Sequence, residues 1–141
     1  MRGKRPCVLV AGPVEVCCKR LRLALEDLEV LHCETLDQAV ERIRHREPDL
    51  IVICYLFDEM RPFRLIHYVR SDLQRSDCPI LLVQVVDGHL RDAELRQLRD
   101  AYGSIGIDGF VNLCEEIGLH GEENALRRFR TSVISRLALA S

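Results

Sequence analysis

Short apolar runs alternate along the chain with longer segments in which apolar residues recur every three or four positions. The apolar runs cover residues 7–11, 29–33, 50–55, 79–86 and 108–113, and each has the length and composition of a β-strand. The runs at 50–55 and 79–86 are apolar almost throughout, which is typical of strands that helices cover on both faces. The pattern therefore predicts five strands, two of them covered on both faces.

The segments between these runs have helical periodicity. They begin near residues 13, 36, 62, 90 and 122, and the last reaches about residue 138. Pro13 suits a first helical turn, and Thr35 with Gln38 forms a capping box. Alternation of strands and helices predicts an α/β fold with a parallel sheet and helices on both faces. Right-handed crossovers favour the flavodoxin-like strand order 2-1-3-4-5.

Domain organisation is simple, because the chain has no repeat, linker or low-complexity segment. Residues 1–141 are expected to form one domain, with a basic tail over residues 1–5. The formal net charge of −2 gives no case for nucleic acid or an anionic membrane. No apolar run approaches the ~18–20 residues of a membrane span. We expect a cytoplasmic protein whose partners are other proteins, without direct nucleic-acid or membrane binding.

Seven cysteines are many for 141 residues. Their odd number and their positions, mostly in apolar segments, predict reduced thiols that pack as small apolar side chains. No CxxC or CxH spacing occurs, so the sequence predicts neither a metal site nor a cofactor.

Three segments carry a family resemblance: PDLIV at 48–52, CPILLV at 78–83 and GIDGFV at 106–111. Their order and spacing resemble the third strand, the fourth strand and the fifth-strand region of response-regulator receiver (CheY-like) domains. The resemblance covers nearly the whole chain. It implies the receiver fold and a role in two-component signalling or another form of bacterial regulation.

The positions that carry phosphorylation in that family differ in this chain. The resemblance places other residues where receivers have two metal-binding acids, the acceptor aspartate, a Thr or Ser, and a Lys: Ala11 and Gly12, Cys54, Gln84, and Leu113. Mg²⁺ requires oxygen ligands, which a methyl group and a hydrogen atom do not supply, and a thiol does not form an acyl phosphate. The resemblance thus implies a degenerate pseudo-receiver, a non-enzymatic interaction module that is independent of phosphorylation.

Receivers commonly bind partners or dimerise through their fourth helix, fifth strand and fifth helix. By resemblance that face corresponds to residues 90–102, 108–113 and 122–137. Its candidate contact residues are Leu98, Tyr102, Ile105 and Phe110. The segment 101–106 is expected to be a longer turn than is usual in the family.

Two alternatives remain open from the sequence. Cys54, at the carboxyl end of a central strand, could be the reactive thiol of a redox sensor or a small enzyme. Asp58, just beyond that strand, could accept a phosphoryl group in place of the missing aspartate.

Overall fold

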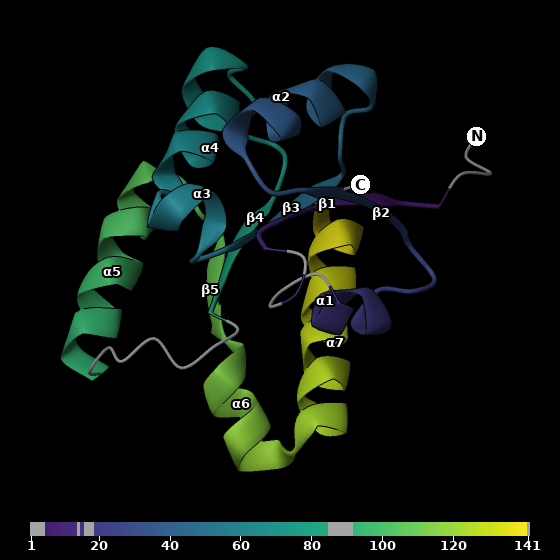
Figure 1. Ribbon diagram of the computed structural model, residues 1–141, viewed down its shortest axis with the longest axis vertical. Helices are drawn as coiled ribbons and strands as arrows, with labels where there is room; N and C mark the ends of the chain where they lie inside the picture. Colours follow the sequence, from purple (N-terminus) through teal and green to yellow (C-terminus); the bar gives the residue numbers. More distant parts are fainter. Residues whose placement is uncertain (1–4, 14, 16–18, 85–91, 141) are drawn as a thin grey trace.

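Five parallel strands form the sheet of the computed structural model, which describes residues 5–13, 15, 19–84 and 92–140. The strand order is β2-β1-β3-β4-β5, so the predicted fold class and topology are confirmed (Figure 1). The strands, in chain order, are β1 (Cys7–Ala11), β2 (Glu29–Cys33), β3 (Leu50–Cys54), β4 (Ile80–Gln84) and β5 (Gly109–Asn112).

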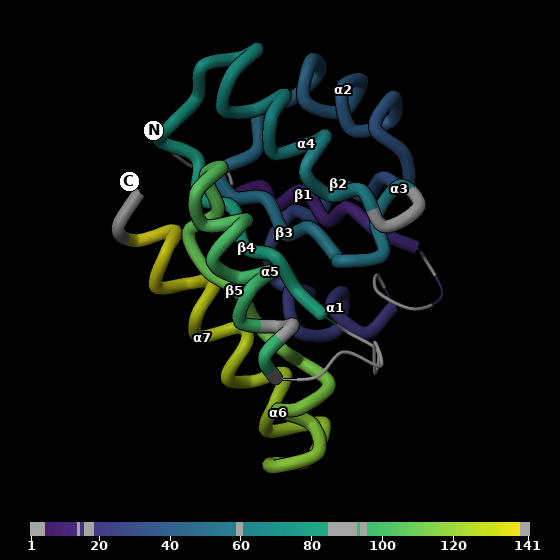
Figure 2. Tube along the Cα trace, turned by 90° about the vertical axis from the view of Figure 1, so that its left-hand side faces the viewer, coloured from purple at the N-terminus to yellow at the C-terminus, as the bar shows by residue number. Residues whose placement is uncertain are grey.

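The helices form two layers, one on each face of the sheet (Figures 1 and 2). One layer holds α1 (Lys19–Ala24) and α7 (Glu122–Ala140), which lie side by side. The other layer holds the remaining helices that flank the sheet: α2 (Leu36–His45), α3 (Phe57–Met60), α4 (Phe63–His67), the π-helical turn η2 (Tyr68–Asp72) and α5 (Asp92–Ile105). The helix predicted from residue 62 to 73 is thus α4 continued by η2.

Alternate strand residues face opposite layers, which creates two apolar cores. Val8, Val52 and Cys54 pack with α1 and α7. Leu9 and Ile53 pack with the layer of α2, α4 and α5. The central strands β1, β3 and β4 are buried along their whole length, as their apolar composition predicts.

Some predicted boundaries lie outside the described residues. These are most of the first turns of the helix predicted to begin near residue 13, at Val14 and residues 16–18, together with the strand end at Val85 and Val86 and the helix start at Leu90. Most of the predicted basic tail, residues 1–4, also lies outside them.

The helix α6 (Leu113–His120) has no counterpart among the sequence-based expectations. The Asn112 side chain caps it, because Oδ1 accepts a hydrogen bond from the Glu115 amide at 3.1 Å. Glu115 and Glu116 occupy its first turn, where the helix dipole favours acids. The chain then turns at Gly121, whose φ is +84°, and α7 packs back against α6. Figure 1 shows this hairpin extending beyond the sheet.

The expected long turn at 101–106 is wrong, because α5 continues to Ile105. The helix stops at Gly106, whose φ of +116° is a conformation that side chains disfavour. A Cβ atom there would also lie 2.9 Å from the Arg70 side chain.

The capping box at Thr35 forms with one difference from expectation. The Thr35 hydroxyl accepts from the Gln38 amide at 3.2 Å. The Gln38 side chain, however, accepts from the amide of Glu34 at 2.8 Å, one residue before the capping residue itself.

Candidate functional site

The carboxyl ends of the parallel strands meet at one edge of the sheet, where ligands bind in open α/β folds. The register pairs Ala11 with Cys33 and Ile53. It pairs Cys54 with Val83, and Gln84 with Asn112. The structure therefore brings together the strand-end positions at which the resemblance places phosphorylation chemistry.

At the end of β1 this edge is filled by an apolar side chain and backbone. Ala11 is fully buried in the core that faces α2 and α4. The Gly12 amide donates to the Cys33 carbonyl at 2.9 Å. The Gly12 carbonyl oxygen lies 3.2 Å from Nε2 of His32. Neither Ala11 nor Gly12 brings a side-chain oxygen that could bind a cation.

Cys54, the last residue of β3, is fully buried in the other core, beside α1 and α7. It is disulfide-bonded. Cys7, Cys33, Cys78 and Cys114 are free. The expectation of reduced thiols throughout is therefore wrong for Cys54. A reactive thiol at this position gains no support, since the sulfur is neither exposed nor free.

Gln84 and Leu113 complete the edge. Gln84 ends β4 and is only 5% exposed. Leu113 is the first residue of α6 rather than the last of β5, and it is fully buried in the core that contains Cys54. At the position where the resemblance places a lysine, the chain thus packs an apolar side chain.

Asp58 lies beyond this edge, in the short helix α3. Its backbone adopts a positive φ of 51°, which is uncommon for a residue with a side chain. Its carboxylate accepts a hydrogen bond from Arg64 at 3.0 Å and is 13% exposed. In the part of the chain that the structure describes, no group of three or more His, Cys, Asp or Glu residues could hold a metal ion.

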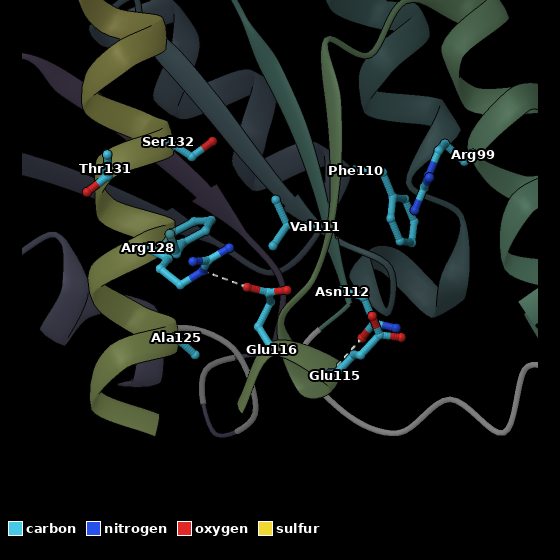
Figure 3. Close-up of a pocket in the computed structure, with 11 residues that line it drawn as sticks. Arg99, Phe110, Val111, Asn112, Glu115, Glu116, Ala125, Arg128, Thr131 and Ser132 are labelled. Atoms are coloured by element: carbon cyan, nitrogen blue, oxygen red, sulfur yellow. Dashed lines mark hydrogen bonds and ion pairs between the residues drawn. The ribbon is translucent and has the colours of Figure 1, made fainter. Parts of the chain in front are cut away.

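A groove of about 550 Å³ lies where α5, β5, α6 and α7 meet, on the expected partner face (Figure 3). We call it the β5 groove. Its lining combines apolar, charged and hydroxyl side chains: Arg99, Phe110, Val111, Asn112, Glu115, Glu116, Ala125, Arg128, Phe129, Thr131 and Ser132.

Two arginines stand on opposite sides of the β5 groove. The Arg99 guanidinium lies 5.5 Å from the centre of the Phe110 ring, a cation–π arrangement. Arg128 donates from Nε to Glu116 at 3.0 Å, as Figure 3 shows. Phe129 and Ala125 are buried beneath. An apolar floor between two planar cations suits the recognition of a protein surface.

Of the four residues expected on the partner face, Phe110 alone lines this groove. Leu98 is half-buried against the opposite core, and Tyr102 belongs to that core with 9% exposure. Ile105 is 43% exposed, but it lines a different groove, beside α4. The acids Glu115 and Glu116 escaped the sequence analysis because their helix was not expected.

The chain resembles known proteins in its structure. No protein-family model matches the chain, and no curated protein matches it.

No described helix is both long enough and apolar enough to cross a membrane.

Solved structures do match over most of the chain. The signal receiver domain of a protein described as a Luxo repressor, from Vibrio parahaemolyticus, is 17% identical with a TM-score of 0.71. The match covers 96% of this chain and 92% of that one. The chemotaxis response regulator CheY4 of Vibrio cholerae is 19% identical with a TM-score of 0.64. The match covers 91% of this chain and 98% of that one.

A third match is the beryllofluoride-activated NtrC4 receiver domain, solved as a dimer. It is 16% identical with a TM-score of 0.59, and the match covers 87% of this chain and 98% of that one. From strand order, layers and these structural neighbours together, the chain has the fold of response-regulator receiver (CheY-like) domains.

Proposed function

We propose that this chain is a protein-interaction module of receiver type that acts in cytoplasmic signalling or regulation without phosphorylation and without catalysis. Its fold is that of signalling domains. Its task would be to present a constant surface to a partner rather than to switch between two states.

The observation that carries this proposal is the burial of positions at which the resemblance places phosphorylation chemistry. Ala11, Cys54 and Leu113 are fully buried, and none of the three side chains carries a carboxylate or a cation. Mg²⁺ prefers hard oxygen ligands in octahedral geometry, and an acyl phosphate requires a carboxylate. An edge packed with apolar side chains supports neither step.

The β5 groove is the proposed partner site. Arg99 is exposed beside a half-buried aromatic ring, and arginine with aromatic residues is enriched at binding hot spots. One structural neighbour was solved as a receiver-domain dimer, which supports self-association as one form of this interaction. The occupant would be a second copy or another protein.

Amide NMR tests whether phosphorylation chemistry is absent. Mg²⁺ and beryllofluoride, titrated to millimolar concentration, should leave the amide signals of Ala11, Gly12, Cys54 and Gln84 unshifted, while an established receiver domain in the same buffer responds. Incubation with acetyl phosphate and Mg²⁺ should add no phosphoryl group. Saturable shifts at these residues would overturn the proposal. Labelling that Asp58→Asn abolishes would do the same and would identify Asp58 as the acceptor.

Charge reversal tests the proposed partner site. Arg99→Glu should weaken self-association, measured by sedimentation, or the capture of an identified partner, by about tenfold or more, as expected for a hot-spot arginine. The matched control is Arg127→Glu on α7, because Arg127 is exposed but does not line the β5 groove. Equal effects of the two variants would show a general charge effect and would argue against this site.

A further inference from the structure

A second groove, of about 380 Å³, lies in the helical layer away from α1 and α7. We call it the α4 groove. Its lining residues come from the start of α2, from α4 and η2, and from the end of α5. Its lining residues are Leu36, Phe63, Arg64, His67, Tyr68, Asp72 and Ile105. Within the part of the chain that the structure describes, α5 alone contributes to both grooves, through Arg99 to one and Ile105 to the other.

The α4 groove exposes an unusual amount of apolar side chain. Six large apolar side chains are exposed among the described residues. Two of them line this groove, Phe63 at 46% and Ile105 at 43%. A third, Leu73, follows directly after Asp72 and is 36% exposed. Leu73 is not among the lining residues, but Phe63 and Ile105 lie in the same groove, and exposed apolar side chains that gather in this way mark binding sites on soluble proteins.

The floor of the groove is continuous with the core. Leu36 and Tyr68 are half-buried and pack against the core that contains Leu65 and Ile66. Those two core residues are fully buried on the inner side of α4. The floor is thus held by close-packed side chains, and a ligand would meet a preformed surface.

The polar side chains at the rim differ in charge between the two ends of the groove. Arg64 and His67 stand on α4, and Asp72 stands at the far end of η2. Arg64 bonds Asp58 through Nη1, which uses one of the five N–H groups of a guanidinium. His67 and Asp72 are exposed. One end of the groove therefore offers hydrogen-bond donors, and the other end offers a carboxylate.

We propose that the α4 groove binds an amphipathic helix of a partner protein. Such a helix inserts apolar side chains at i, i+4 and i+7 into an apolar groove, and here they would contact Phe63, Tyr68 and Ile105. An acid of the helix would accept hydrogen bonds from Arg64 and His67. A Lys or Arg about one to two turns away would pair with Asp72. The charges on the rim thus fix the direction of the bound helix.

Selection from a displayed library of helical peptides tests whether the α4 groove binds such a helix. The peptides carry fixed leucines at i, i+4 and i+7, and all other positions are varied. Selection on the wild-type protein, with counter-selection on Phe63→Glu, should enrich peptides that carry an acid at one end and a base at the other. Phe63→Glu and Ile105→Lys should each lower the affinity of the protein for the enriched peptides by about tenfold or more. Leu119→Glu is the matched control, because Leu119 is 68% exposed but lies on α6.

Exchange of the rim charges tests the direction. Arg64→Glu and His67→Glu combined with Asp72→Lys should favour peptides whose acid and base have been exchanged. The proposal is overturned if no peptide depends on Phe63, or if enriched peptides show no charge preference. It is equally overturned if the wild-type protein is a dimer that Phe63→Glu converts to monomer, since a second copy would then occupy the groove. Circular dichroism of each variant confirms that it is folded.

Discussion

Arg70 joins three backbone segments at the edge of the sheet opposite the candidate site. Its guanidinium donates to the carbonyls of Gly106 at 2.9 Å and Cys78 at 2.8 Å. It also donates to the Asp108 carboxylate at 2.9 Å. The Asp108 carboxylate accepts in turn from the Ile80 amide at 2.7 Å. With its side chain only 14% exposed, Arg70 fixes the entry of β4 and β5 into the sheet.

Arg70→Met should lower the free energy of unfolding by about 2–3 kcal/mol, because several charge-assisted hydrogen bonds are lost and their carbonyl partners remain partly buried. Urea denaturation measures this. Arg127→Met is the control, since its ion pair with Glu123 is exposed and should contribute at most about 0.5 kcal/mol. Similar losses for both variants would contradict a structural role for Arg70.

Two buried thiols respond to pH in a defined way. Burial raises the pKa of Cys7 to about 11, and it raises the pKa of Cys78 to about 11 as well. Both thiols therefore stay protonated at neutral pH and are poor nucleophiles. In the unfolded chain they lose their protons near their ordinary pKa of 9.0.

Between about pH 9 and 11 the unfolded state thus binds fewer protons than the folded state, so stability falls as the pH rises. The contribution of these thiols is fully present below pH 9. Comparison of urea midpoints at pH 8 and pH 10 should show a smaller fall for Cys7→Ala/Cys78→Val than for the wild-type protein. Parallel falls for the two proteins would show that other groups, such as tyrosines, account for the loss.

At the scale of elements, the hairpin of α6 and α7 depends on the Asn112 cap. Asn112→Ala should reduce the free energy of unfolding by about 1 kcal/mol, the usual effect of losing a side-chain cap. Thr131→Ala is the control, because the Thr131 hydroxyl bonds only the Arg127 carbonyl within α7 and is exposed. Hydrogen exchange should show the loss concentrated in α6. Unchanged exchange in α6 would contradict the cap.

The strands and their order could be predicted because buried parallel strands leave continuous apolar runs. Ala11 and Cys54 could be located for the same reason, since each ends such a run. The helix α6 was missed although Asn112 and Glu115 have the spacing of a cap, because it has only 8 residues and Gly118 interrupts it. The β5 groove could not be foreseen, because it depends on how α6 packs against α7. The disulfide of Cys54 has no local signal in the spacing of the cysteines.

At the scale of the whole molecule, the two cores share the central strands and should unfold together. All three tyrosines, Tyr55, Tyr68 and Tyr102, pack on the side of α2, α4 and α5. Tyrosine fluorescence therefore reports one layer, whereas far-UV circular dichroism also follows α1 and α7. We expect coincident urea midpoints, as for a single cooperative domain. Earlier loss of the helical signal would instead show that α1 and α7 unfold separately.

The strand ends also bear on how such a sequence can evolve. Ala11 and Cys54 are fully buried but belong to different cores. A carboxylate introduced at either position alone would lie among apolar side chains without a cation to offset it, and an uncompensated buried charge costs several kcal/mol. Selection for stability would therefore disfavour each acid on its own.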